Sequence, residues 1–171
     1  MRIYLVGFMG SGKSTMGQMV ADTLQVNFFD TDVVIESQAG MTISGIFSTQ
    51  GESAFRELEA DILRQSVIYE KALIASGGGL PCFFDNMQWM NAHGITMYLS
   101  WPDDILKSHL IKQLSTRPLL EHLPAEEAEE KIALLLSERK PYYEMAAMTI
   151  EMEGNLEKDL VKLEKACRYI W

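Results

Sequence analysis

The sequence has little cysteine, few basic residues and no long apolar run. Its two cysteines, Cys82 and Cys167, form neither a disulfide framework nor a spaced set of metal ligands, so we expect reduced thiols. No apolar stretch approaches the length that crosses a bilayer, and no signal or transit segment is recognisable. We therefore expect a cytoplasmic protein that does not associate with membranes.

Basic residues are outnumbered, with 15 Lys and Arg against 24 Asp and Glu, a formal net charge of −9 and an isoelectric point near 4.8. Such a balance argues against a surface that grips nucleic acid through its phosphates. A length of 171 residues with 47% hydrophobic and 23% charged residues suits one folded domain. We expect a single domain, residues 1–171, and a monomer.

The clearest motif is residues 7–15, Gly-Phe-Met-Gly-Ser-Gly-Lys-Ser-Thr, between an apolar run and an amphipathic helical pattern. It fits the phosphate-binding loop, in which glycines let main-chain N–H groups close around phosphate oxygens at a helix N-terminus. Lys13 supplies a point charge to the outer phosphates, and the Ser14 hydroxyl suits Mg²⁺. The candidate nucleotide-binding residues are Gly10, Ser11, Gly12, Lys13, Ser14 and Thr15.

Strand and helix patterns alternate along the chain. Short apolar runs predict strands at residues 3–6, 26–29, 72–75, 95–99 and 148–152, and helical periodicity occupies most of the sequence between them. This alternation predicts an α/β fold with a parallel sheet of about five strands and helices on both sides.

Two carboxylates, Asp30 and Asp32, follow the second predicted strand. If the chain stays extended there, both point to one side, where one could help to hold Mg²⁺ and the other could accept a proton from an attacking hydroxyl. The strand at residues 72–75 ends in Ser76 and offers no acid for this purpose. A turn role for Asp30 and a helix N-cap role for Asp32 are the alternatives.

Three arginines are candidates for binding an anionic ligand. Arg56 lies off the apolar face of a predicted helix, Arg117 precedes a proline on a loop between two helices, and Arg139 lies near a helix end. Arg56 could instead pair with Glu52 or Glu59 on its own helix, and Arg139 could be only a helix-end charge.

Three consecutive glycines, residues 77–79, follow the strand at residues 72–75. Their high conformational cost suggests a backbone that a ligand approaches closely, and a plain loop is the alternative.

Taken together, these motifs resemble the shikimate kinase family over nearly the whole chain. The pattern consists of the phosphate loop, Asp30-Thr31-Asp32, Phe55-Arg56 with Glu59, the glycine triplet, Arg117-Pro118-Leu119-Leu120, and Glu138-Arg139 followed by Pro141 and Tyr143. The resemblance implies a three-layer α/β/α sandwich of the P-loop, nucleoside monophosphate kinase-like class, with a five-stranded parallel sheet. It also implies a substrate-binding helical region at about residues 31–63 and a helical lid at about residues 112–124.

The resemblance further implies ATP-dependent phosphorylation of the 3-hydroxyl of shikimate, with ATP and Mg²⁺ as cofactors. Its implied residue roles are as follows: Asp32 as substrate ligand and base, Arg56, Arg139 and Gly78 as substrate ligands, Lys13 and Arg117 on the transferring phosphoryl group, and Ser14 and Asp30 at Mg²⁺. Two alternatives stay open: a kinase of another small acceptor, such as a sugar acid or a nucleoside monophosphate, and a nucleotide-dependent switch with no metabolite substrate.

Overall fold

A five-stranded parallel sheet forms the centre of the part of the chain that the structure describes, residues 1–111 and 124–171 of a computed structural model. The order across the sheet is β2-β3-β1-β4-β5. Neighbouring strands are parallel throughout, as expected for apolar runs buried on both faces. The strands are β1 (Arg2–Val6), β2 (Asn27–Asp30), β3 (Ala72–Ala75), β4 (Ile95–Ser100) and β5 (Met148–Glu151).

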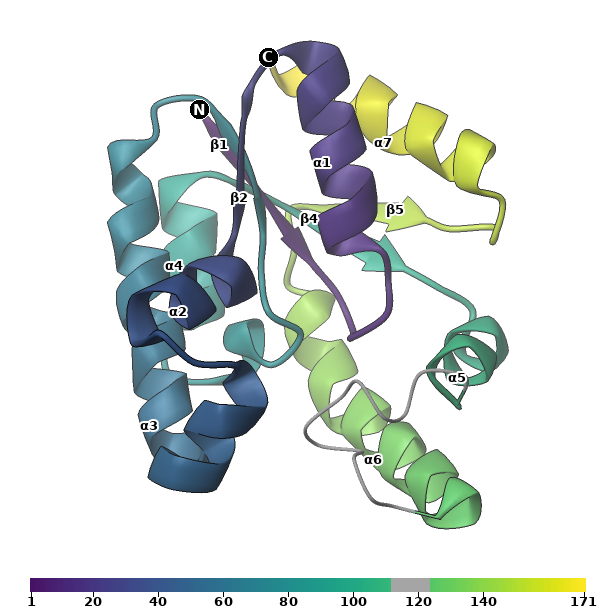
Figure 1. Cartoon of the computed structure of the whole chain (residues 1–171). Helices are drawn as coiled ribbons and strands as arrows, with labels where there is room; N and C mark the ends of the chain where they lie inside the picture. Colours follow the sequence, from purple (N-terminus) through teal and green to yellow (C-terminus); the bar gives the residue numbers. More distant parts are fainter. Residues whose placement is uncertain (112–123) are drawn as a thin grey trace.

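Helices cover both faces of this sheet, as Figure 1 shows, which confirms the predicted three-layer α/β/α class. They are α1 (Lys13–Leu24), α2 (Thr31–Ala39), α3 (Ile43–Gln65), α4 (Asn86–His93), α5 (Asp103–Ile111), α6 (Ala125–Tyr143) and α7 (Leu156–Ile170). Two short 3₁₀ turns, η1 (Ser66–Ile68) and η2 (Leu80–Cys82), flank β3. The predicted lid, about residues 112–124, lies almost wholly outside the described residues.

The core is divided between the two faces by the alternation of β1. Ile3 and Leu5 pack with buried residues of α1 and α7, whereas Tyr4 and Val6 pack with those of α3, α4, α5 and α6. All four side chains are fully buried. The central strand is therefore fixed from both sides, and with it the loop that follows.

The order of the strands places a crevice beside that loop. β1 lies between β3 and β4, so the loop that follows the carboxyl end of β1 lies between the ends of two neighbouring strands. In open parallel sheets, ligands bind at such a position, outside the carboxyl ends of the strands.

The α2–α3 region consists of two helices separated by Gly40. Gly40 ends α2 in the left-handed conformation, and the Thr42 side chain caps α3 by accepting the N–H of Gly45. Inside α3, Gly51 has φ 84°, so the helix is interrupted there and resumes in a new direction. Residues on both sides of this break line the same cavity.

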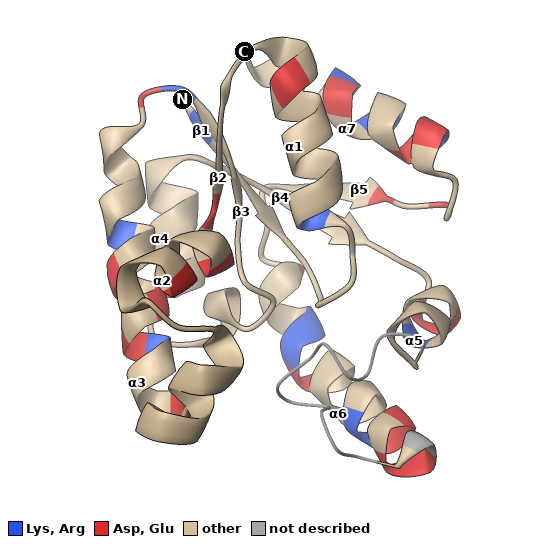
Figure 2. Cartoon of the chain, in the orientation of Figure 1, with Lys and Arg blue, Asp and Glu red and all other residues tan. Residues whose placement is uncertain are grey.

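Charge is distributed unevenly over this frame. Figure 2 shows a basic residue at the start of α1 and acidic residues on α2, whereas α3, α6 and α7 carry residues of both signs. Within the described ranges, none of the helices combines the length and the apolar composition that a membrane crossing requires.

Candidate active site

The phosphate-loop motif forms the connection between β1 and α1. Gly10 and Gly12 have φ values of 76° and 81°, a region that side chains disfavour, so the loop needs glycine at both positions. The loop encloses a cavity of about 270 Å³. Its lining residues are Met9, Gly10, Gly12, Lys13, Ser14, Thr15, Asp32, Ser76 and Gly78.

Lys13 is folded into this loop. Its Nζ donates to the carbonyl oxygens of Gly7 and Phe8, each at 2.8 Å, and to Ser11 Oγ at 3.2 Å. The side chain is 7% exposed and still lines the cavity. The loop therefore holds a positive charge directly at the wall where phosphates would bind.

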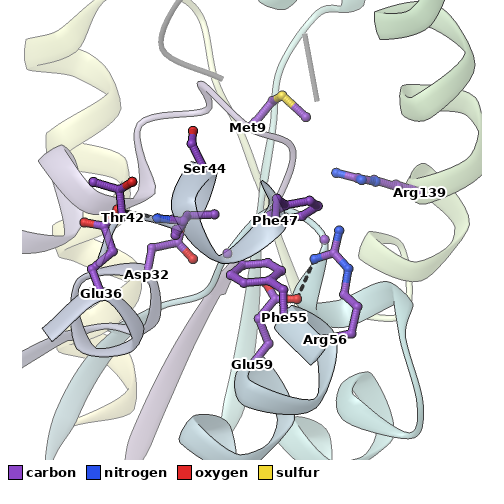
Figure 3. A pocket seen from close by; sticks show the side chains of 14 residues that line it. Met9, Asp32, Glu36, Thr42, Ser44, Phe47, Phe55, Arg56, Glu59 and Arg139 are labelled. Atoms are coloured by element: carbon purple, nitrogen blue, oxygen red, sulfur yellow. Dashed lines mark hydrogen bonds and ion pairs between the residues drawn. The ribbon is translucent and has the colours of Figure 1, made fainter. Parts of the chain in front are cut away.

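A second cavity, of about 350 Å³, lies beside the first. Figure 3 shows side chains entering it from the phosphate loop, α2, α3 and α6. The lining residues are Met9, Asp32, Glu36, Thr42, Ile43, Ser44, Phe47, Phe55, Arg56, Glu59, Gly77, Gly78, Gly79 and Arg139. Met9, Asp32 and Gly78 line both cavities, so the two spaces share a wall.

Arg56 is the most tightly held cation of this second cavity. Nε and Nη2 donate to Glu52 Oε1 at 3.2 and 2.8 Å, and Nη1 donates to Glu59 Oε2 at 2.5 Å. The guanidinium carbon also lies 4.2 Å from the centroid of the Phe83 ring. These bonds use three of the five guanidinium N–H groups, and two are left for a ligand.

The sequence left two roles open for Arg56, ion pairing on its own helix and ligand binding. The structure is compatible with both, since Arg56 pairs with Glu52 and Glu59 and also lines the cavity. Burial by itself lowers the pKa of Arg56, but Glu59 and Glu52 outweigh it, so the pKa is raised and the guanidinium stays charged.

Arg139 reaches the same cavity from α6, across from α3 (Figure 3). It is 6% exposed, and its guanidinium carbon lies 5.9 Å from the centroid of the Phe8 ring, which belongs to the phosphate loop. Two arginines from different helices thus line one cavity. Such guanidinium forks bind planar carboxylates, and also phosphates, through two parallel hydrogen bonds.

The glycine triplet makes this convergence sterically possible. A Cβ atom on Gly77 would lie 2.6 Å from Asp32 Oδ1, and one on Gly79 would lie 2.5 Å from Arg56 Nη1. A Cβ on Gly78 would lie 2.9 Å from the main-chain nitrogen of Met9. Each glycine therefore makes room for a different part of the site.

Two hydrogen bonds, which sequence reasoning did not find, fix the triplet in place. Tyr143 Oη donates to the carbonyl of Gly78 at 2.5 Å, and the Gly77 N–H donates to Thr31 Oγ1 at 2.9 Å. Tyr143 is fully buried and lies one helical turn after Arg139 on α6. That spacing is the signal that could have identified it.

Asp30 and Asp32 do not lie on one side of an extended strand, because α2 begins at Thr31. Asp30 is the N-cap of α2, and its Oδ1 accepts the N–H groups of Asp32 and Val33. Asp32 lies in the first helical turn and lines both cavities. The cap role foreseen for Asp32 belongs to Asp30, and Asp32 is the carboxylate that faces both spaces.

The structure thus brings together most of the predicted site residues. Asp32, Arg56, Gly78 and Arg139 line the second cavity. Gly10, Gly12, Lys13, Ser14 and Thr15 line the first, whereas Ser11 is a fully buried residue of the loop and Asp30 caps α2. Arg117 lies outside the described residues.

Glu59 and Phe47 are cavity residues that the sequence interpretation did not include as site residues. Glu59 could have been found from its position one helical turn after Arg56. Phe47 carries no such local signal, because its place depends on the break at Gly51.

The described residues contain no group of three or more His, Cys, Asp or Glu side chains that could hold a metal ion. Ser14 and Asp32 nevertheless line one cavity with the phosphate loop. Mg²⁺ commonly binds through one or two protein ligands together with substrate phosphates, and this set of donors fits that mode.

Comparisons with known proteins agree on one family. The family model described as shikimate kinase matches residues 9–168. The shikimate kinase of Parabacteroides distasonis is 41% identical over 166 residues, which cover 96% of each chain.

Solved structures give the same result. The shikimate kinase of Bacteroides thetaiotaomicron superposes with a TM-score of 0.88 and 34% identity over 98% of both chains. The shikimate kinase of Acinetobacter baumannii, solved in complex with shikimate, has a TM-score of 0.88 and 34% identity, covering 98% of this chain and 93% of that one. A gluconokinase from Sinorhizobium meliloti, 13% identical with a TM-score of 0.61, shares the fold.

The buried Glu59 gives the site a pH-dependent stability. Burial raises the pKa of Glu59 from 4.5 to about 7, against the opposing attraction of Arg56. Between these two pH values the folded protein holds a proton on Glu59 that the unfolded chain has lost. The protonated Glu59 therefore makes its full contribution to the free energy of unfolding below pH 4.5, and this contribution is lost as the pH rises through 7.

We predict that Glu59→Gln removes this dependence. The free energy of unfolding of the wild type, relative to that of the variant, should fall by roughly 2 kcal/mol between pH 5 and pH 8. Urea unfolding at a series of pH values measures it, with Glu57→Gln, at an exposed position of the same helix, as the control. Parallel profiles for wild type and Glu59→Gln would contradict the prediction.

Proposed function

The chain belongs to the shikimate kinase family, and from that premise we propose how its two cavities divide the phosphoryl transfer between them. The protein is a shikimate kinase, which uses ATP to phosphorylate the 3-hydroxyl of shikimate in the biosynthesis of chorismate and the aromatic amino acids. The observation that carries the proposed division is the wall of Met9, Asp32 and Gly78 that both cavities share. Nucleotide phosphates bind on one side of this wall and the acceptor on the other.

Shikimate binds in the cavity lined by α2, α3 and α6. Its carboxylate lies between Arg56 and Arg139, which approach that space from different helices. The main chain at Gly78 and the carboxylate of Asp32 bind the opposite part of the acceptor, beside the phosphate loop. Residues 31–63 therefore form the substrate-binding region. The shikimate complex of the Acinetobacter baumannii relative supports a site for this substrate.

Asp32 acts as the base. Because it lines both cavities, it is the carboxylate that can accept the proton of a hydroxyl directed at the terminal phosphate. Phosphoryl transfer depends mainly on positioning and charge stabilisation, so holding the hydroxyl in line is the larger part of its role.

The phosphate loop holds ATP. Main-chain N–H groups within residues 10–15 bind the phosphates, Lys13 turns from the loop carbonyls toward them, and Arg117 adds a second cation. Mg²⁺ bound together with ATP would neutralise part of the phosphate charge. We assign its protein ligands to Ser14, which lines the cavity, and to Asp30, the N-cap of α2.

We further propose that the protein works as a cytoplasmic monomer on a small-molecule substrate and without nucleic acid. Its net charge of −9 supports the last point.

A panel of acceptors tests the activity. In the presence of ATP and Mg²⁺, ADP formation should depend on shikimate, stop when EDTA is added, and remain at background with gluconate or a nucleoside monophosphate. A coupled ADP assay measures this. Turnover of gluconate but not of shikimate would overturn the assignment, and so would slow hydrolysis that no acceptor accelerates.

Asp32→Asn tests the base. We expect kcat to fall by at least about a hundredfold, because the amide cannot take up the proton, while ADP affinity changes by less than about threefold. Steady-state kinetics and ADP titration measure the two effects, with Asp61→Asn on the exposed side of α3 as the control. A proportional loss of ADP affinity would instead place Asp32 in nucleotide binding alone.

Arg56→Lys tests the carboxylate site. Lysine keeps the charge but cannot form two parallel bonds, so KM for shikimate should rise by roughly tenfold to a hundredfold while KM for ATP stays constant. Arg64→Lys is the matched control, since Arg64 lies on the same helix and bonds Asn86 at 2.7 Å outside the cavity. Equal effects of the two variants would show that Arg56 acts only through the stability of α3.

A further inference from the structure

Trp101 lies directly after β4 and just before α5, behind the phosphate loop. Its indole Nε1 donates to the carbonyl oxygen of Ser11 at 3.0 Å, across 90 positions of the sequence. The ring is partly buried and packs against both core clusters, one on each face of the sheet. It also contacts the His109 ring of α5 edge-on, with the centroids 5.8 Å apart. Trp101 is therefore a firmly held donor aimed at the loop.

The bond from Trp101 acts on one particular peptide unit. In a planar trans peptide the C=O and N–H groups point in opposite directions. A bond that holds the Ser11 carbonyl toward Trp101 therefore directs the Gly12 N–H the other way. Gly12 lines the cavity of the loop, whereas Ser11 is fully buried and neither it nor Trp101 lines that cavity.

The loop needs such an external constraint because of its own glycines. Gly10 and Gly12 flank Ser11, and glycine accepts either sign of φ at little cost. The Ser11–Gly12 peptide could therefore turn over and present its carbonyl oxygen to the phosphates. The Ser11 N–H is bonded to Phe8 O at 3.2 Å, which fixes the preceding peptide, and Trp101 fixes the following one.

The same part of the chain contacts the loop at a second point. A Cβ on Gly10 would lie 2.9 Å from a methyl carbon of Leu110 in α5, so the helix packs closely against the loop. Figure 1 shows α5 connected to the end of β4 by the segment that contains Trp101. The loop is thus supported from behind by residues 101–110.

We infer that Trp101 is a positioning residue for the nucleotide: its indole N–H holds the Ser11–Gly12 peptide so that the Gly12 N–H faces the phosphates. This inference rests on the proposed assignment of the loop to ATP. It adds a residue that never touches the ligand and that the loop motif itself does not contain.

Trp101→Phe tests the inference, because phenylalanine keeps a six-membered aromatic ring and loses the pyrrole ring with its N–H donor. Trp171→Phe is the matched control, since Trp171 Nε1 also donates to a main-chain carbonyl, that of Met1 at 2.9 Å, far from the site along an exposed edge. We expect Kd for ADP and KM for ATP to rise about tenfold in Trp101→Phe and to stay within twofold of wild type in Trp171→Phe.

Shikimate affinity in the absence of nucleotide separates positioning from damage to the fold. It should stay within twofold of wild type in Trp101→Phe, and a parallel loss of shikimate and ADP affinity would overturn the inference. Wild-type ADP affinity in Trp101→Phe would also overturn it. ADP binding does not depend on turnover of shikimate, so a wild-type enzyme inactive on shikimate would refute the proposed function while this comparison still tests Trp101.

A measurement on the wild-type protein covers the case in which Trp101→Phe does not fold. The indole N–H signal of Trp101 in the NMR spectrum, assigned by the loss of signals in Trp89→Phe and Trp171→Phe, should exchange with solvent more slowly than that of Trp171. ADP should slow it further. Exchange at the rate of a free indole in the ADP complex would contradict the role.

Discussion

Two side chains and the phosphate loop pack against one short turn after β3, and the turn accommodates them because residues 77–79 carry no Cβ. Asp32 approaches Gly77, the phosphate loop approaches Gly78, and Arg56 approaches Gly79, each closer than a Cβ atom would allow. Thr31 and Tyr143 then hold the turn by hydrogen bonds from α2 and α6. Gly78 of this turn lines both cavities of the site.

Charge pairing within the cavity lined by α2, α3 and α6 reduces the cost of burying cations in an acidic protein. Arg56 is held by two carboxylates and covered by the Phe83 ring, so its geometry is fixed before any ligand arrives. The remaining N–H groups and the guanidinium of Arg139 offer binding capacity to a further carboxylate. A pre-organised arrangement of this kind lowers the entropic cost of binding.

Local patterns in the sequence predicted the strands, the alternation of strands with helices and the phosphate loop, because apolar periodicity and glycine-rich motifs act over a few residues. The exchange of roles between Asp30 and Asp32 was missed because strand and helix meet at Thr31, and alternation stops there. The bonds from Tyr143 to Gly78 and from Trp101 to Ser11 join residues 65 and 90 positions apart. A local spacing points to Tyr143 on the face of Arg139, but the partners of both bonds lie far along the chain and required the tertiary structure.

The central claim is that Asp32, Arg56 and Arg139 surround one acceptor beside the nucleotide phosphates. A crystal structure of the protein with ADP and shikimate tests it most directly. The account predicts the shikimate carboxylate within hydrogen-bond distance of both guanidinium groups and a ring hydroxyl on Asp32, facing the phosphate loop. A carboxylate bound away from either arginine, or a ring whose hydroxyls face away from the loop, would contradict it.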